Sequence, residues 1–241
     1  MPEFLTFTLA APLAAMGEIA VGERRSGWDR PSRSALLGLV AACLGLDRDD
    51  EEAHLALEAG YGLAVRVEKL GPVLADYHTA QVPSAKRGRH FATRAEELDL
   101  PGHELNTILS RRDYRADLMA FIALWPRDNP RWPLQQIAAA LRAPHFVPFF
   151  GRKSCPLMLP FAPSVADSPD AIMALEEYAS TQIEQGPLPP VYLRGHQVVI
   201  ALDPADVGNY AVQRVELRRD RLSSRRRWQF LLREEAVLGK P

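Results

Sequence analysis

Near the start of the chain, residues 4–9 (FLTFTL) place two threonines among four apolar residues, a pattern that predicts a first strand partly buried on both faces. The next periodic stretch predicts a helix with one buried stripe, formed by Leu36, Leu37, Val40, Cys43 and Leu44. Ser32 can cap the start of this helix, and Gly45 suits a left-handed stop. Inside the helix Gly38 costs about 1 kcal/mol relative to alanine, so we expect another backbone to approach closely there.

Further helices and strands follow from the same periodicities. In chain order they are a helix capped by Asp49 or Asp50 and ending near Gly60, a strand over 62–70, a strand over 118–125, a helix between Pro133 and Pro144, a helix over 172–183, and short strands at 197–202, 210–217 and 228–232. Residues 218–227, between the last two strands, are expected to form an arginine-rich loop.

Periodicity fails over residues 71–116. Long structureless loops are uncommon in compact domains unless they are functional or mobile, so this stretch is expected to be an insertion that forms a protruding hairpin. The remaining order is strand, helix, strand, strand, helix and a sixth element, which is the order of the ferredoxin-like (RRM-like) unit. The predicted fold class is therefore α+β: a single domain over 1–241, with an irregular, β-rich C-terminal extension over about 160–241. Unrelated proteins share this topology, so it does not decide the function.

Composition excludes several classes of protein. The start of the chain lacks the basic segment of a signal peptide and carries Glu3 and Pro12, and no run approaches the ~20 apolar residues of a membrane span. We therefore expect a cytoplasmic protein. Cys43 and Cys155 are too few for a disulfide framework or a zinc site. We expect no metal and no cofactor.

Charge is segregated along the chain although the net charge is only −1. Acidic residues collect in 47–58 and 167–184. Basic residues collect in separate clusters, namely Arg24, Arg25, Arg30 and Arg33, then Lys86, Arg87 and Arg89, then Arg111, Arg112 and Arg115, and finally the run 214–227, which includes Arg225 and Arg226. A nearly neutral protein with separated patches can bind a polyanion on one face and a protein on another.

Two of the basic segments have the chemistry of a phosphate site. Gly151, Arg152, Lys153 and Ser154 follow two phenylalanines, so backbone N–H groups, cations and stacking surfaces lie together. The arginines of 24–33 precede a helix N-terminus, which favours an anion. Arginine also suits forked contacts to phosphate and stacking on bases. These features favour RNA binding, although a solvated loop before a core helix is the alternative for 24–33.

An enzymatic interpretation rests on Tyr77, His78, Lys86 and His90, which include the base and acid groups that a metal-independent ribonuclease needs. Elsewhere the histidines are scattered without metal-ligand spacing, and the chain contains neither a Walker A loop nor a G-x-S-x-G motif. The ribonuclease remains the alternative to a binding protein.

Four motifs carry a resemblance to a known family, and they are LAAPLAAMGE at 9–18, RPSRSALLGLVAACLGLDRDD at 30–50, DYHT at 76–79 and HFVPFFGRKSCPL at 145–157. With them the chain resembles the CasD-type subunits (the Cas-five family) of type I-E CRISPR Cascade surveillance complexes, which act in antiviral defence. The motifs extend from the first strand to residue 157, and the similarity is looser beyond Asp167.

The resemblance implies an RRM-like domain with a thumb-like hairpin, here 71–116, that holds the 5′ handle of the CRISPR RNA. It also implies contacts with the repeated backbone subunit and with the large subunit, target DNA being met only indirectly, and no membrane partner. Type I-C relatives process the RNA themselves with a Tyr, Lys and His set, but in type I-E systems another subunit cuts it. We therefore expect no catalytic residues here. The candidate RNA-binding residues are Arg24, Arg25, Arg30, Arg33, Tyr77, His78, Lys86, Arg87, Arg89, Arg111, Arg112, Gly151, Arg152, Lys153, Ser154, Arg225 and Arg226.

Overall fold

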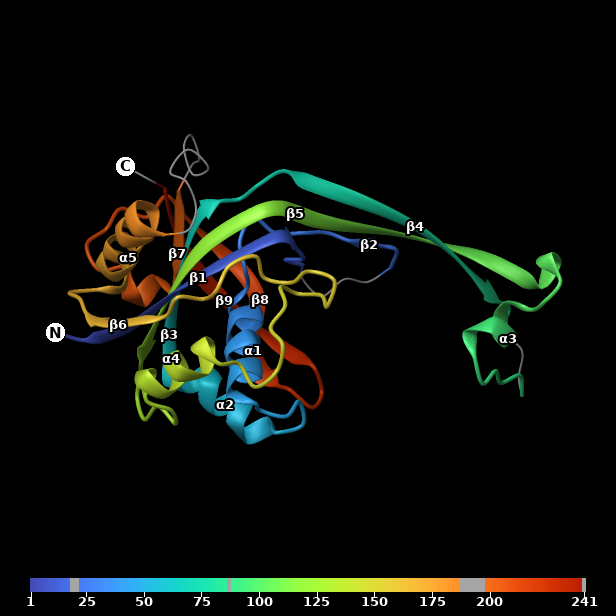
Figure 1. Cartoon of the computed structure of the whole chain (residues 1–241), viewed down its shortest axis with the longest axis horizontal. Coiled ribbons are helices and arrows are strands. Elements are labelled where there is room, and N and C mark those ends of the chain that lie inside the picture. Colours follow the sequence, from blue (N-terminus) through green and yellow to red (C-terminus); the bar gives the residue numbers. More distant parts are fainter. Residues whose placement is uncertain (18–21, 86–87, 187–197, 240–241) are drawn as a thin grey trace.

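One mainly antiparallel sheet runs through the molecule in the order β6-β1-β5-β3-β7-β9-β8, while β2 and β4 pair with β5 outside this path (Figure 1). The computed structural model describes residues 1–17, 22–85, 88–186 and 198–239. The strands are β1 (Glu3–Ala14), β2 (Arg24–Arg25), β3 (Tyr61–Lys69), β4 (Val73–Pro83), β5 (Leu105–Pro126), β6 (Ser164–Asp167), β7 (Val199–Leu202), β8 (Arg214–Ser224) and β9 (Gln229–Gly239). Only the short pairing of β2 with β5 is parallel among the pairings of these strands.

Helices cover both faces of the central strands (Figure 1). The helices are α1 (Arg33–Leu44), α2 (Glu51–Gly60), α3 (Arg94–Leu98), α4 (Leu134–Arg142) and α5 (Ala171–Gln185). On one face α1, α2 and α4 pack over alternate strand residues such as Phe7 and Ile122. On the other face α5 packs over the intervening residues, including Phe4 and Phe121. Two covered faces explain why the central strands read as nearly continuous apolar runs.

Local signals in the sequence determine both ends of α1. The side chain of Ser32 accepts a hydrogen bond from the Ala35 N–H, and Gly45 adopts φ 77°, so both predicted caps are confirmed. The prediction for Gly38 is wrong, because a Cβ added there would meet nothing within 4 Å outside its own helix. Gly38 lies on the partly exposed side of α1, and larger apolar side chains such as Leu36 make the contact with the core.

A long hairpin projects from the body of the molecule (Figure 1). Its stem pairs β4 with the first half of β5, from Val73 opposite Arg115 to Pro83 opposite Leu105. The short helix α3 and a 3₁₀ turn at Gly102–Glu104 lie at its far end. The predicted third strand began at 118, too late, because the stem of β5 is mostly exposed and therefore shows no apolar alternation.

The C-terminal region contains more strand than predicted. Residues 218–224 belong to β8 rather than to a loop, and the turn into β9 is confined to 225–228. Arg218 and Asp220 face inward and are buried. Because the inward-facing residues are charged, this strand lacks the apolar alternation from which a strand is predicted. The prediction also missed β6, which pairs with β1 at the edge of the sheet. Residue 197 of the predicted strand 197–202 lies outside the described residues, and β7 begins at Val199.

Candidate nucleic-acid interface

Three strands meet at the root of the hairpin, and their register places arginines from distant parts of the chain side by side. Arg24 in β2 lies opposite Arg111 in β5, which in turn lies opposite Tyr77 in β4. One position along, Arg25 lies opposite Arg112. Directly paired residues share a face of the sheet, so these rows present arginines on both faces of the root. We call this group of Arg24, Arg25, Arg111 and Arg112 the root cluster.

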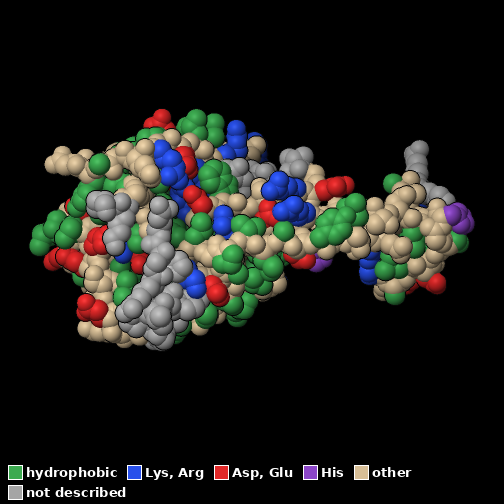
Figure 2. Space-filling model, turned by 90° about the horizontal axis from the view of Figure 1, so that it is seen from above, with side chains coloured by type: hydrophobic (Ala, Val, Ile, Leu, Met, Phe, Trp, Pro, Cys, Tyr) green, Lys and Arg blue, Asp and Glu red, His purple; other side chains and the backbone are tan. Residues whose placement is uncertain are grey.

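One buried carboxylate fixes two members of the root cluster. Asp113 has a side chain only 8% exposed, and it accepts from Arg24 Nη2 at 3.4 Å and from Arg111 Nε at 3.2 Å. The two arginine side chains remain 66% and 50% exposed. Arg25 donates from Nη1 to the Gly22 carbonyl at 2.6 Å. Ordered cations with solvent-facing edges suit contacts to phosphate oxygens. Figure 2 shows Lys and Arg side chains gathered where the hairpin leaves the body of the molecule.

The glycine loop, residues 151–154, is clamped against the end of β1. Gly151 has φ 80°, and a Cβ there would collide with the carbonyl oxygen of Ala15, so only glycine fits. The Ala15 N–H donates to the Phe150 carbonyl at 3.2 Å. Two further bonds close the turn, from Phe150 N–H to the Cys155 carbonyl and from Cys155 N–H to the Arg152 carbonyl, both 2.8 Å. The loop is therefore held in one shape without a ligand.

A cation–π contact joins the glycine loop to the root of the hairpin. The Arg152 guanidinium lies 4.8 Å from the centre of the Tyr114 ring. Tyr114 is two residues after Arg112 on β5, so their side chains share a face of the strand. Nη1 of Arg152 is buried and has no hydrogen-bond partner in the structure, which is unusual for a polar atom. Lys153 and Ser154, next in the loop, are exposed.

Arg30 and Arg33 occupy a different environment, and we revise the expectation that they contact RNA. Arg30 is 1% exposed and its guanidinium contacts Asp29, Glu216 and Glu235. Burial disfavours its charge, but the three carboxylates outweigh burial and raise the pKa of Arg30. Arg33 donates to the side chain and carbonyl of Glu58 and to a further backbone carbonyl. Both side chains are structural, because their donors face protein acceptors inside the fold.

Other candidates lie away from the root cluster. Arg89 is beyond the stem of the hairpin, where it pairs with Glu104 at 2.6 Å. The candidates Lys86 and Arg87 lie outside the described residues.

Arg225 and Arg226 occupy the β8–β9 turn beside α2. Arg225 lies 4.3 Å from the Trp228 ring centre, and the backbone N–H of Arg226 donates to Glu51. The pKa of Arg225 is lowered, mainly because the side chain is partly buried and secondly because the Arg48 charge repels it. Through Glu51 this turn contacts the start of α2, and it lies away from the hairpin root (Figure 1).

Among the residues proposed for a ribonuclease, the three that the structure describes are not brought together. Tyr77 and His78 are neighbours on β4, so their side chains point to opposite faces of the hairpin. His78 pairs with Asp76. His90 is exposed near the far end, beyond Pro83, and Lys86 is not described. Across the described ranges no group of three or more His, Cys, Asp or Glu side chains could hold a metal ion, and no helix is long and apolar enough to cross a bilayer.

Comparison with known proteins decides the family. A family model described as CRISPR-associated protein (Cas_Cas5) matches residues 4–234, nearly the whole chain. The chain belongs to the Cas5 family. The chain is 32% identical over 186 residues to the CRISPR system Cascade subunit CasD of Escherichia coli (strain K12), an alignment that covers 74% of this chain and 78% of CasD.

Solved structures give the same result for the fold. A chain of a CRISPR RNA-guided surveillance complex superposes with a TM-score of 0.64 at 25% identity, covering 98% of this Cas5 chain and 90% of the other. A crystal structure of a Cas protein superposes with a TM-score of 0.58 at 19% identity, over 99% and 95% of the two chains, and shows the shared fold alone. The likeness in fold therefore extends over nearly the whole of this chain.

Proposed function

We propose that this Cas5 protein is an RNA-binding subunit of a CRISPR effector complex of the Cascade type, acting in antiviral defence. The observation that carries the proposal is that Arg25 and Arg112 of the root cluster share one face of the hairpin root with the glycine loop, which reaches this face through Arg152 over Tyr114. Relatives named as a Cascade subunit and as part of an RNA-guided surveillance complex support it.

The ligand that suits this surface is the 5′ handle of the CRISPR RNA. Arg25 and Arg112 would position phosphates beside the glycine loop. On the opposite face of the root, in the row of Arg24 and Arg111, Tyr77 is 63% exposed and offers a ring on which a base can stack. We propose a non-catalytic role, since the Tyr77, His78 and His90 side chains do not converge on one point of the hairpin. The backbone and large subunits of the complex would be its protein partners, and target DNA would be met indirectly.

The fold assignment can also be made finer. The strand order β6-β1-β5-β3, with α1 and α4 against one face, corresponds to the arrangement of a ferredoxin-like or RRM-like unit. We assign the hairpin within 71–116 as the thumb of that domain, and about 160–241 as a C-terminal extension of the single domain 1–241. In this arrangement the RNA surface lies where the thumb leaves the sheet.

Salt dependence of RNA binding tests the proposal. Wild-type protein is titrated into a labelled single-stranded RNA carrying the handle sequence, at several salt concentrations. The Arg25→Ala, Arg112→Ala double variant should lower affinity and flatten the log–log salt slope by about 1.4, since each single-strand phosphate contact contributes ~0.7. Arg219→Ala with Arg221→Ala, two exposed arginines on β8, is the matched control and should keep the wild-type slope.

Two results would overturn the proposal. An unchanged slope in the root-cluster variant would place the RNA elsewhere. Specific cleavage of repeat RNA, lost in His78→Ala, would instead favour a metal-independent endoribonuclease.

A further inference from the structure

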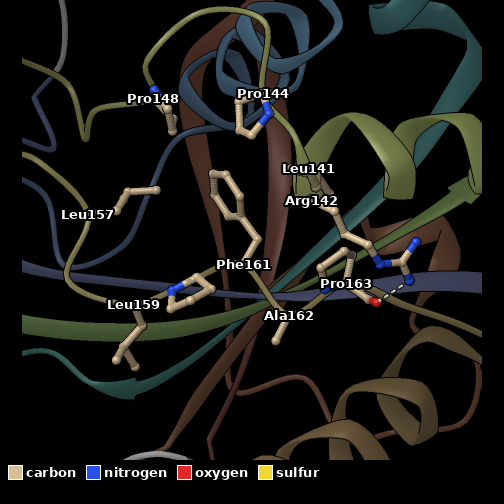
Figure 3. Close-up of a pocket in the computed structure, with 10 residues that line it drawn as sticks. Leu141, Arg142, Pro144, Pro148, Leu157, Leu159, Phe161, Ala162 and Pro163 are labelled. Atoms are coloured by element: carbon tan, nitrogen blue, oxygen red, sulfur yellow. Dashed lines mark hydrogen bonds between the residues drawn. The ribbon is translucent and has the colours of Figure 1, made fainter.

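A preformed apolar hollow lies between α4 and β6, in the segment 143–163 that links them. Its volume is about 380 Å³, and Figure 3 shows its lining residues, among them Leu141, Pro144, Pro148, Leu157 and Phe161. Arg142 lies at its margin and donates from Nη2 to the Pro163 carbonyl at 2.9 Å. The surface is therefore aliphatic and aromatic with one cation beside it.

Backbone hydrogen bonds fix this segment although it contains no helix or long strand. The His145 N–H donates to the Cys43 carbonyl at the end of α1, at 3.0 Å. Met158 N–H donates to the Ala10 carbonyl at 2.9 Å, and Thr8 N–H donates to a carbonyl of the segment, that of Phe161, at 2.7 Å. Because the segment is already held against α1 and β1, little conformational entropy should be lost when a partner fills the hollow.

The same segment exposes large apolar side chains next to the hollow. Val147 is 84% exposed, Phe146 is 43%, Phe149 is 40% and Met158 is 37%. Scattered single apolar residues are ordinary on a surface, but several in one short segment beside an apolar hollow mark an interaction site.

Charge and shape indicate the kind of partner. Residues 129–166 contain no aspartate or glutamate, and the charged side chain beside the hollow is the cation Arg142. The partner should therefore carry carboxylates. The hollow is walled mainly by proline and leucine and offers few polar groups that could read a base edge. Phe146 and Phe149 expose rings beside it, but Val147, the most exposed side chain of the segment, gives no stacking surface. A protein fits this surface better than RNA does.

We propose that the segment 143–163, together with the end of α4, is the docking surface for a neighbouring protein subunit of the effector complex. This partner places a large apolar side chain in the hollow and sets carboxylates against Arg142. The inference rests on the part of the proposed function that puts this chain in a multi-subunit complex. The glycine loop lies within the same segment, so the partner would meet this chain beside the RNA.

A surface substitution tests the docking proposal without disturbing the core. Val147→Glu should lower the amount of this chain recovered with the co-expressed complex by about tenfold, since it removes an apolar contact and repels an acidic partner. Its melting temperature and its affinity for the handle RNA should stay at the wild-type values. Val212→Glu, at an exposed valine before β8 that is 43% exposed, is the matched control and should assemble normally.

A photo-crosslinking amino acid at position 147 identifies the occupant within the assembled complex. Crosslinking to another protein subunit supports the proposal. Crosslinking to RNA or to a second copy of this chain, no crosslink at all, or normal assembly of Val147→Glu overturns it. If wild-type protein fails to bind RNA but position 147 still crosslinks to a subunit, the RNA function fails and the docking surface stands.

Discussion

Replacing Arg30 by alanine should destabilise the fold, although its sequence neighbours are exposed arginines. The side chain is 1% exposed, with Nε 2.6 Å from Glu235 and Nη1 2.6 Å from Asp29. Nη2 contacts Glu216. Alanine would leave Glu235, itself 3% exposed, without one of its cations.

The expected loss follows from the cost of an unpaired buried charge. Removing one partner of a buried ion pair costs about 3–5 kcal/mol. Glu235 keeps Arg218 at 3.1 Å and Arg233 at 2.5 Å, so the lower end, about 3 kcal/mol, applies. In a chain of this size each kcal/mol shifts the melting temperature by about 2–4 °C. Arg30→Ala should therefore melt about 6–12 °C below wild type.

Thermal unfolding followed by circular dichroism measures this shift. Arg25→Ala removes the same charge five residues earlier, but the Arg25 side chain is exposed. The free energy of unfolding of this variant should therefore differ from wild type by no more than about 0.5 kcal/mol. If Arg30→Ala melts with wild type, the ionic cluster does not stabilise the fold and the structural role given to Arg30 is wrong.

Other predictions test separate features. Tyr114→Leu should weaken RNA binding by about two- to fivefold while Tyr114→Phe retains it, because the ring positions Arg152; equal affinity of all three proteins in anisotropy titrations would contradict this. Burial raises the pKa of Cys43 to about 12, so iodoacetamide at pH 8 should alkylate it only in denaturant, and labelling of native protein at the unfolded rate would show an accessible thiol. Burial also raises the pKa of Glu58, despite Arg33, so this carboxyl should make wild-type stability fall as pH rises above about 4.5. Glu58→Gln should remove that part of the slope in urea unfolding, and identical pH profiles would refute it.

Local signals allowed parts of the fold to be predicted from sequence. A serine oxygen at Ser32 and a left-handed glycine at Gly45 act within one turn of the helix, so α1 was bounded correctly. The cap at Asp50 and the end of α2 at Gly60 followed from the same reasoning. The glycine loop could also be located, since Gly151 adjoins both cations and aromatic residues.

Features that depend on distant partners could not be predicted. Buried charged residues are rare, so Arg30, Arg218 and Asp220 read as surface residues, and only the tertiary fold places Glu235 205 positions away from Arg30. Tyr114 was missed for a similar reason. Its role depends on Arg152, which the chain brings to β5 through the return of the segment after α4.

Trp28 lies between the buried Arg30, which is structural, and the exposed Arg24 and Arg25, for which we propose RNA contacts. The guanidinium of Arg218 lies 4.3 Å from its ring centre and that of Arg30 lies 5.9 Å away. The Trp28 backbone N–H donates to the Met16 carbonyl at the end of β1. The buried arginines therefore hold the indole, and the Trp28 backbone ties the segment that follows β2 to the residues just after β1.

Loss of Arg30 should then weaken RNA binding indirectly, by loosening β2, whereas loss of Arg25 removes a contact. The two effects differ in their salt dependence. Well below the melting temperature, Arg25→Ala should flatten the log–log slope by about 0.7, while Arg30→Ala should lower affinity and keep the slope. A flattened slope in Arg30→Ala would mean that its guanidinium reaches the RNA after all. In that case the loop must open on binding, and the buried cluster would be the closed state of that loop.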